Sequence, residues 1–188
     1  MSNEPVPQHE MSLVADESRT TSWDDARDRL ANPEPNSHAW LATVRPDGRP
    51  HLMPVIPFWI EGALHFVAGE GTRKGRNLAA NAWCVVGTES RKLPSLDVIV
   101  DGRAEPLEDP DAVRRIAEVL ASNGWPLEAR GVEVHGPNAP TAGPPPYRIY
   151  RVTPARAFGL PGNYGMDQFK PEELPKPTRW DFSTDQGG

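Results

Sequence analysis

The sequence predicts a mainly β, α+β domain, with about six strands in an antiparallel barrel and three short flanking helices. Segments rich in strand formers follow one another at short intervals. Turn signals such as Pro46-Asp47-Gly48 join the early segments as hairpins. Hairpin-linked strands favour an antiparallel barrel over a doubly wound sheet, because parallel strands need long crossovers that are usually helical.

Length and charge narrow the class of protein. The 188 residues carry a formal net charge of −6 and predict one domain over 21–160, a flexible N-terminal arm over 1–20 and a C-terminal tail over 161–188. An acidic chain argues against general nucleic-acid binding. No segment has the apolar length of a membrane span, and the N-terminus lacks a signal-peptide pattern, so we expect a cytoplasmic protein that binds neither membrane nor nucleic acid.

The first predicted elements are a helix and a hairpin. Ser22 and Asp25 have capping-box spacing before a helix that Pro33 ends. Residues 39–45 alternate like a strand, and the turn leads into a second extended segment over 50–60. Its three prolines cannot donate ladder hydrogen bonds, so we expect this strand to lie at an edge or to be interrupted.

The remaining elements follow from similar signals. We expect strands over 63–69, 83–89, 96–107 and 147–159, with residues 96–107 buried on both faces. A helix is expected to start near Thr72 and to continue through 76–82, and a second one to cover 110–122 behind the Asp109 cap. Residues 132–147 are rich in proline and glycine and predict a loop, either a lid or a rigid surface connection.

Several kinds of chemistry lack a sequence signal. The five histidines have no metal-ligand spacing, so no metal site is expected. There is no G-x-S-x-G elbow, and GEGTRK (69–74) matches neither nucleotide-binding glycine motif. The single cysteine, Cys84, lies in an apolar run and predicts a buried, unreactive thiol.

The segment GEGTRKGRNLAAN (69–81) is the strongest candidate site. A helix start exposes unpaired N–H groups that suit an anion such as phosphate. Thr72 can cap this helix, while Arg73 and Lys74 can bind different phosphate oxygens, and Asn77 follows one turn later. A solvated basic helix start without a ligand is the alternative.

Two segments in this order, HAWLATVRPDGRPHLMPV (38–55) and ALHFVAGEGTRKGRNLAAN (63–81), resemble the pyridoxamine-phosphate-oxidase-like split β-barrel family of flavin and deazaflavin proteins. The resemblance covers about residues 37–106 and resumes at 140–159 and 178–182, which resemble a subgroup common in actinobacteria. It implies a six-stranded, Greek-key split barrel. It also implies a homodimer with two cofactor sites at the subunit interface.

The resemblance also implies which residues hold the cofactor. The second strand would back an isoalloxazine-type ring, the third would flank the ribityl chain, and the loop and helix would bind phosphate. The C-terminal tail would pack near the cofactor site, and its aromatic residue would either cover the ring of its own or the partner's site or anchor the tail to the barrel. The residues are, in that order, Met53, Pro54, Val55, Ile56, Pro57 and Phe58; Phe66, Val67 and Ala68; Thr72, Arg73, Lys74 and Asn77; and Trp180.

The sequence departs from the family pattern at the second strand. True pyridoxamine phosphate oxidases carry an arginine and a lysine there, whereas His51 is the only basic residue in HLMPVIP. We therefore expect an FMN-dependent oxidoreductase with a different, unknown small-molecule substrate. The alternatives are a reductase using coenzyme F420, whose anionic tail would use Arg76, Arg91 or Lys92, and a non-catalytic flavin-binding protein. Catalytic residues are not assigned; three tyrosines, 147, 150 and 164, are candidate acids by residue type alone.

Overall fold

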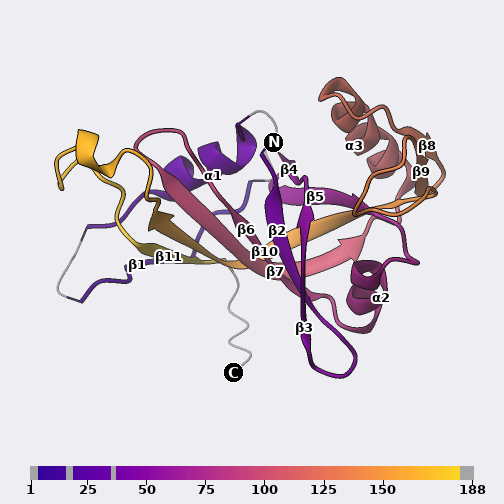
Figure 1. Cartoon of the computed structure of the whole chain (residues 1–188), viewed down its shortest axis with the longest axis horizontal. Coiled ribbons are helices and arrows are strands. Elements are labelled where there is room, and N and C mark those ends of the chain that lie inside the picture. The colour runs from indigo at the N-terminus through magenta and orange to yellow at the C-terminus, as the bar shows by residue number, and fades with distance from the viewer. Residues whose placement is uncertain (1–3, 16–18, 35–36, 183–188) are drawn as a thin grey trace.

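The structure is a computed structural model that describes residues 4–15, 19–34 and 37–182 (Figure 1). Its helices are α1 (Trp23–Ala31), α2 (Arg73–Ala80) and α3 (Pro110–Ser122), with a 3-10 turn over Met166–Gln168. Its strands are β1 (His9–Ser12), β2 (Ala39–Val44), β3 (Pro50–Val55), β4 (Phe58–Ile60), β5 (Ala63–Ala68), β6 (Trp83–Thr88), β7 (Leu96–Pro106), β8 (Glu128–Arg130), β9 (Glu133–His135), β10 (Arg148–Pro161) and β11 (Thr178–Asp181).

The strands form an antiparallel sheet in the order β1-β11-β10-β7-β6-β2-β3, with β5 bridging β10 and β4. The long strand β10 closes the barrel. One of its edges pairs with β7, and the other pairs first with β5 and then with β11. The predicted mainly antiparallel barrel is confirmed, although the described part of the chain contains more strands than the six expected.

The expected 50–60 strand is both interrupted and at an edge. It divides into β3 and β4 at Ile56-Pro57, and the two parts pair with different strands, β2 and β5. β4 pairs with residues 63–65 of β5, so no strand of the described residues pairs with 66–68 of β5 on that edge. The barrel is therefore split between β3 and the end of β5.

The helices begin where capping chemistry predicts. Ser22 accepts a hydrogen bond from the Asp25 N–H, and α3 covers the expected 110–122 behind Asp109. α2 begins at Arg73, three residues before the 76–82 run, because Thr72 is its cap and Gly75 tolerates the first turn. A Cβ at Gly75 would lie 2.6 Å from the Gly69 carbonyl oxygen, so this close approach requires glycine.

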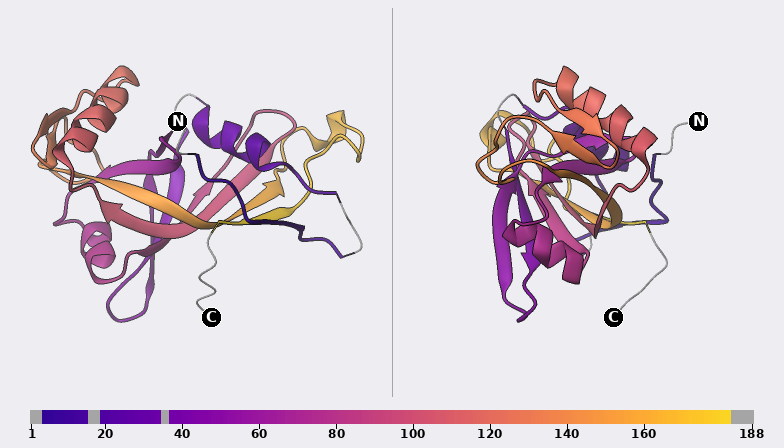
Figure 2. Two further views of the ribbon diagram at one scale, coloured as in Figure 1. Left: turned by 180° about the vertical axis from the view of Figure 1, so that it is seen from behind. Right: turned by 90° about the vertical axis from the view of Figure 1, so that its right-hand side faces the viewer.

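Two apolar clusters form the core. The larger fills the barrel and includes Leu41, Phe66, Val98 and Trp180, with α1 packed against it. The smaller lies outside the barrel, between β5, β10 and α3. Figure 2 shows α3 and the β8–β9 hairpin at one end of the molecule, with β1 and β11 toward the other end.

The described part of the N-terminal arm is structured, which corrects the expectation of a flexible 1–20 segment. β1 pairs with β11 along its whole length, because the C-terminal tail offers an edge strand. The arm also accepts hydrogen bonds from three tryptophan indoles: Trp23 to the Pro5 carbonyl, Trp59 to Glu4 and Trp180 to Glu10. Residues 1–3 and 16–18 of the arm lie outside the described residues.

Two further expectations were wrong. β7 alternates between buried and partly exposed residues, so it is covered on one face and not on both; Ile99 is the apolar residue that hides this alternation in the sequence. The 132–147 segment is not all loop, since β9 pairs with β8 and Val134 bridges to Tyr147. The tail beyond 161 contributes β11, and residues 183–188 lie outside the described residues.

Candidate functional site

The β2–β3 hairpin sets which groups face the split. Gly48, at φ 82°, closes the turn, and the Arg45 N–H donates to the Arg49 carbonyl at 2.9 Å. Hydrogen-bonded and non-hydrogen-bonded pairs alternate along an antiparallel ladder. Counting from the 45–49 hydrogen bond, Thr43 and His51 form a hydrogen-bonded pair, and the pairs 44↔50, 42↔52 and 40↔54 are non-hydrogen-bonded. Pro50 and Pro54 thus occupy positions whose backbone groups point away from β2.

The two prolines therefore leave the β2 ladder intact while removing N–H groups from the open edge of β3. The same alternation points the Leu52 backbone N–H and carbonyl toward the split. β3 is an end strand of the sheet, so no strand of the described chain satisfies these groups. This edge can hydrogen-bond a planar ligand through its backbone.

Helix α2 begins at one end of the split. Thr72 Oγ1 accepts from the Gly75 N–H at 3.1 Å and donates to the Gly69 carbonyl at 2.7 Å. Arg73 is exposed and forms no hydrogen bond or ion pair with any residue that the structure describes. Arg76 donates back to the Gly71 carbonyl. Arg73 is therefore the cation of this turn that is free to bind a ligand.

Lys74, which we expected to bind phosphate, forms a hydrogen bond within the chain. Its side chain is buried, and Nζ donates to the Thr141 carbonyl in the proline-rich segment after β9. Burial lowers the pKa of Lys74 to about 8. Lys74 and Arg73 do splay apart, but Lys74 ties α2 to the 136–146 loop while Arg73 faces solvent.

The 136–146 loop is held at several points. Tyr147 donates its hydroxyl to the Pro137 and Gly143 carbonyls at 2.9 and 3.0 Å. The Gly69 N–H donates to the Ala142 carbonyl, and Lys74 holds Thr141. These contacts favour the rigid connection over the lid.

Asn77 links α2 to the β2–β3 hairpin. It is fully buried, and Nδ2 donates to Thr43 Oγ1 at 2.9 Å, while Oδ1 has no partner. Thr43 Oγ1 also lies 3.3 Å from His51 Nδ1. A 180° turn of the Asn77 amide would let Thr43 donate to Oδ1 and would leave an amide N–H for an anion.

A cluster of positive charge surrounds His51. Burial lowers the pKa of His51, and the charges of Arg45, Lys74 and Arg73 lower it further. The Arg45 Nε atom is buried without a hydrogen-bond partner in the structure. A bound anion would accept a hydrogen bond from this donor and would offset the charge of the neighbouring cations.

Sequence reasoning missed Arg45 and Thr43. The family pattern predicts a cation on the second strand, whereas Arg45 follows β2, just before the hairpin turn. The turn itself was the available signal, because its geometry fixes Thr43 opposite His51.

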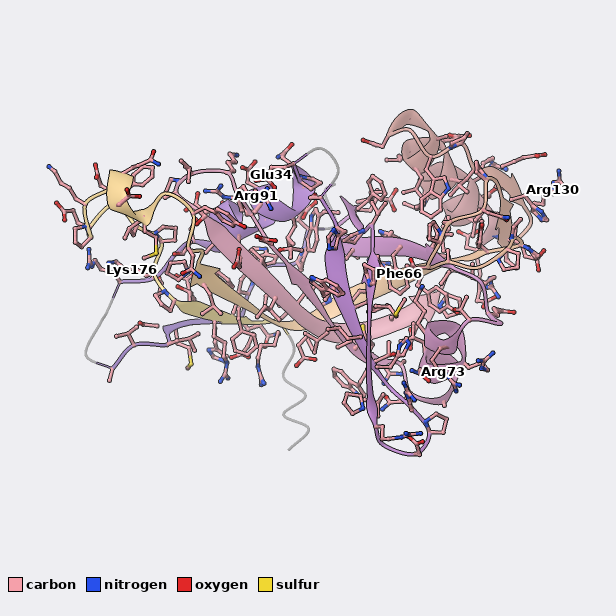
Figure 3. All side chains as sticks on the ribbon, in the orientation of Figure 1. Glu34, Phe66, Arg73, Arg91, Arg130 and Lys176 are labelled. Carbon is pink, nitrogen blue, oxygen red and sulfur yellow. The ribbon has the colours of Figure 1, made fainter. Side chains whose placement is uncertain are left out.

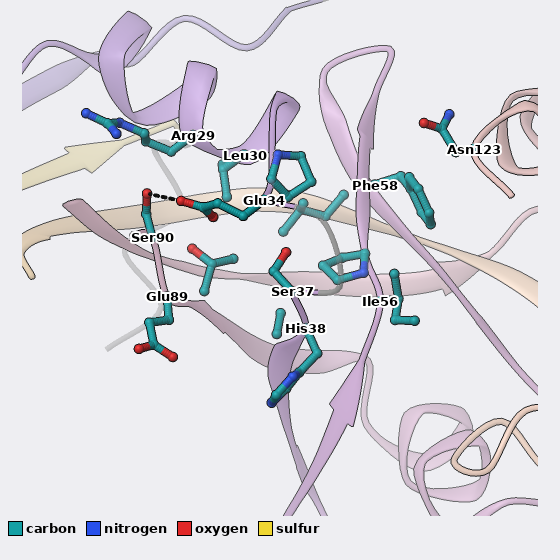
Figure 4. Close-up of a pocket in the computed structure, with 15 residues that line it drawn as sticks. Arg29, Leu30, Glu34, Ser37, His38, Ile56, Phe58, Glu89, Ser90 and Asn123 are labelled. Atoms are coloured by element: carbon teal, nitrogen blue, oxygen red, sulfur yellow. Dashed lines mark hydrogen bonds between the residues drawn. The ribbon is translucent and has the colours of Figure 1, made fainter. Parts of the chain in front are cut away.

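A cavity of about 310 Å³ adjoins residues 56–58, between the end of α1 and the ends of β3 and β6 (Figure 4). Its apolar wall includes Leu30, Ile56, Pro57, Phe58 and Leu64, and its polar wall includes Arg29, Glu34, Ser37, His38, Glu89 and Ser90. This cavity lies beyond the end of β3 remote from His51.

The acidic groups of this cavity already have partners. Glu34 accepts from the Arg91 and Lys92 N–H groups at 2.7 and 2.6 Å. Burial alone would raise the pKa of Glu34, but backbone hydrogen bonds hold it below its usual value. Glu89 accepts from the Tyr164 hydroxyl. The cavity thus offers an apolar wall, charged groups that are already hydrogen-bonded within the chain, and polar groups such as the Ser37 hydroxyl.

Several expected cofactor residues are buried inside the chain. All of β5 is buried, including Phe66, Val67 and Ala68, and Phe66 stacks on Tyr150 with centroids 5.3 Å apart. These side chains fill the core, so β5 presents only its backbone edge to the split. Val55 is buried as well, whereas Met53, Pro54, Pro57 and Phe58 are half-buried and Ile56 is exposed.

Trp180 is buried in the core of its own chain. Its side chain is 0% exposed and packs on Trp23, with centroids 5.5 Å apart. It lies in β11, whereas α2 lies at the other end of the molecule (Figures 1 and 2). The geometry is that of an anchor for the tail, because a buried indole fills the barrel core and pins β1 through Glu10.

The proposed tail-binding cations also separate. Arg91 lies over the Tyr164 ring at 5.1 Å, and Lys92 pairs with Asp28 at 2.6 Å. Both sit beside α1, and Figure 3 shows Arg91 next to Glu34 and well apart from Arg73. The structure brings neither of them to α2.

The open-sided barrel, with a cationic cluster at one end of its split, defines a split β-barrel protein. A family model described as pyridoxamine 5'-phosphate oxidase matches residues 26–160, and the chain belongs to this family. No curated protein matches the chain. In the described residues no helix is long and apolar enough to cross a bilayer, and no three metal-ligating side chains come together.

Solved structures share the fold at low sequence identity. A conserved hypothetical protein from Mycobacterium tuberculosis is 19% identical, with a TM-score of 0.58 over 80% of this chain and 90% of its own. A putative pyridoxamine 5'-phosphate oxidase from Listeria innocua is 16% identical, with a TM-score of 0.55 over 75% and 100%. A FAD-binding protein from Mesorhizobium loti is 20% identical, with a TM-score of 0.54 over 86% and 96%.

Proposed function

We propose that the chain is an FMN-dependent oxidoreductase that acts on a small molecule in the cytoplasm, as a homodimer with its cofactor sites at the subunit interface. The observation that carries this proposal is the cationic cluster around His51 at one end of the split. Within the described part of the chain, it contains two buried polar atoms without partners, Arg45 Nε and Asn77 Oδ1, and an arginine without an ion pair, Arg73.

The cluster fits a phosphate group. Arg73 and Arg45 would donate to its oxygens, and the first-turn N–H groups of α2 would add a partial positive charge. Lys74 would contribute through its charge, since its Nζ is committed to Thr141. Arg45 replaces the basic residue that the second strand lacks. The FAD-binding neighbour agrees with a flavin-type ligand, although its likeness is one of fold.

The open edge of β3 fits the rest of the cofactor. The backbone groups at Leu52 face the split, and Met53 to Phe58 lead from it toward the 310 Å³ cavity. When bound, the flavin would supply the hydride or electron transfer. The residues of this chain would hold the phosphate, orient the ring through the backbone and hold an uncharged or weakly polar substrate against Ile56 and Phe58.

An apolar sheet face supports the homodimer. Ala42 lies directly opposite Leu52 and Val85, so these side chains share one face of β2, β3 and β6. Trp40 and Trp83 lie two positions further along the same face, and they are 48% and 43% exposed. A second copy is the occupant we propose, since this face adjoins the β3 edge and would bring its cofactor sites to the interface.

Titration of the purified protein with FMN, followed by quenching of flavin fluorescence, tests the cofactor assignment. Arg73→Gln and Arg45→Gln should each weaken binding by about tenfold or more, because charge-assisted hydrogen bonds contribute roughly 1.5–3 kcal/mol. Arg91→Gln, which removes the same charge beside α1 and away from α2, should leave the affinity unchanged. Equal affinity in all variants would refute the phosphate site.

The same titration decides between the alternatives. Coenzyme F420 remains the alternative cofactor, but its anionic tail would have to use cations near α2, because Arg91 and Lys92 lie elsewhere. Tighter binding of F420 than of FMN would favour an F420-dependent reductase. Binding of FMN without turnover of any electron acceptor would favour a non-catalytic flavin-binding protein.

A further inference from the structure

A second hollow lies on the outside of the barrel, beside the start of α3. Its volume is about 450 Å³, and its lining includes Glu61, His65, Glu105, Asp109, Arg115 and Arg151. His65 and Val67 alternate with the barrel-filling Leu64 and Phe66, so His65 points to the α3 side of β5. This hollow therefore differs from the proposed cofactor cleft, which opens between β3 and β5.

Two unsatisfied polar groups meet in this hollow. His65 and Arg151 are direct cross-strand neighbours on β5 and β10. His65 is 2% exposed, and neither its Nδ1 nor the buried Arg151 Nε has a hydrogen-bond partner among the residues that the structure describes. Buried polar atoms without partners are rare, because each one costs the free energy of its lost hydration.

The acidic groups around the hollow are already compensated. Glu61 pairs with Arg115 at 3.4 Å, Glu105 pairs with Arg103 at 3.1 Å, and Glu108 pairs with Arg148 at 2.7 Å. The Asp109 carboxylate caps α3 by accepting from the Asp111 N–H at 3.0 Å. Among the described lining residues, Arg151 is the cation without an ion-pair partner.

The state of His65 sets what the hollow can accept. Burial and the charge of Arg151 lower the pKa of His65 to about 4, so the ring is neutral at pH 7. The Ala63 backbone and the charge of Glu61 act in the opposite direction and offset this lowering only in part. A neutral imidazole has one N–H and one lone pair, and the tautomer with its proton on Nε2 presents the lone pair at Nδ1, the buried nitrogen without a partner among the described residues. Arg151 Nε, beside it, is a donor.

We propose that this hollow binds a small oxyanion that carries a hydroxyl group, such as hydrogenphosphate or a 2-hydroxycarboxylate. The oxyanion would accept from the Arg151 guanidinium, and the hydroxyl would donate to His65 Nδ1. An oxyanion without a hydroxyl would direct an oxygen at the His65 lone pair and would bind less well. A cation would face Arg151 without a free carboxylate to offset the repulsion.

The comparison of phosphate with sulfate tests this proposal, because the two ions have one shape and sulfate carries no proton at pH 7. Lactate and propionate make the same comparison among carboxylates, because they differ only in the 2-hydroxyl group of lactate. NMR spectra of the full-length protein with labelled histidines would follow His65 and His51 together, at constant ionic strength. Phosphate and lactate should shift the His65 signals at concentrations about tenfold lower than sulfate and propionate do.

Variants separate this site from the cofactor cleft. Arg151→Gln should abolish the His65 response, while Arg73→Gln should leave it intact and diminish that of His51. Arg151→Lys keeps the charge without the planar fork and should respond weakly, and circular dichroism would check that each variant folds. An unchanged His65 signal with phosphate, or an equal response to sulfate, would overturn the proposal. Neither result would affect the FMN assignment, which His51 reports.

Discussion

Thr43 and His51 face each other across the β2–β3 hairpin, and Thr43 Oγ1 lies 3.3 Å from His51 Nδ1 while it accepts from Asn77. This contact joins the sheet to α2, the two elements that supply the cations. It also places the His51 imidazole where the charge of a bound anion would change its pKa. His51 is therefore the natural reporter of the proposed phosphate site.

FMN binding should raise the pKa of His51. In the free protein, burial and the charges of Arg45, Lys74 and Arg73 lower this pKa, and a bound phosphate would offset those charges. Because the protonated ring would then be favoured in the complex, FMN affinity should fall as pH rises through the His51 pKa. An NMR pH titration with and without FMN measures this, with His9 on β1 as the reference. An identical His51 pKa in both states would contradict the site.

The buried ammonium of Lys74 should make stability depend on pH in the alkaline range. Its pKa is about 8 in the folded chain and 10.5 ordinarily, so between these values the unfolded chain binds more protons. The free energy of unfolding from this group therefore rises with pH from about 8 to 10.5, by up to about 3 kcal/mol, and the penalty is fully present below pH 8.

Urea denaturation at several pH values would test this rise. Lys74→Met should lose it, while Lys170→Met, at an exposed lysine, should keep it. The comparison must be between variants, because Cys84 acts in the opposite direction: burial raises the pKa of its thiol to about 12. Parallel pH profiles for Lys74→Met and the wild-type chain would show that Lys74 is not desolvated.

Glu10 should be a stabilising residue of the N-terminal arm. It accepts a hydrogen bond at 3.0 Å from the indole N–H of Trp180, which is fully buried. Glu10→Ala leaves this donor unpaired and should lower the free energy of unfolding by about 1–3 kcal/mol. Glu118→Ala, at an exposed residue of α3, should cost far less. Denaturation followed by tryptophan fluorescence measures both, and equal stabilities would show that the arm does not hold Trp180.

Local signals predicted most of the fold. Capping residues located α1 and α3, and the Pro46-Asp47-Gly48 turn located the first hairpin, because these motifs act within a few residues. The arm and the tail were not predicted, since β1 and β11 have strand character only through their pairing with each other and with β10. Long-range pairing leaves little trace in the sequence of a short polar strand.

The site was predicted in part for the same reason. Thr72 as the cap and Arg73 as a free cation follow from the sequence near the helix start. The burial of Lys74 does not, because Thr141 comes from a loop far along the chain. The role of Trp180 could not be decided from the sequence. An aromatic residue in a polar tail suggests either a ligand contact or an anchor, and only the tertiary packing places it in the core.

Replacing Gly102 should destabilise the chain, because β7 and β10 approach closely at this position. A Cβ at this position would lie 2.2 Å from the Thr153 carbonyl oxygen, next to the irregular register between Pro154 and Arg156. Gly102→Ala should therefore lower the free energy of unfolding by at least about 2 kcal/mol, since backbone atoms cannot move aside as a side chain can. Gly87→Ala is the matched control, because Gly87 lies in the neighbouring strand β6 and a Cβ there would meet no atom within 4 Å. Thermal or urea unfolding would compare the two variants, and similar losses in both would mean that the close approach at Gly102 is easily relieved.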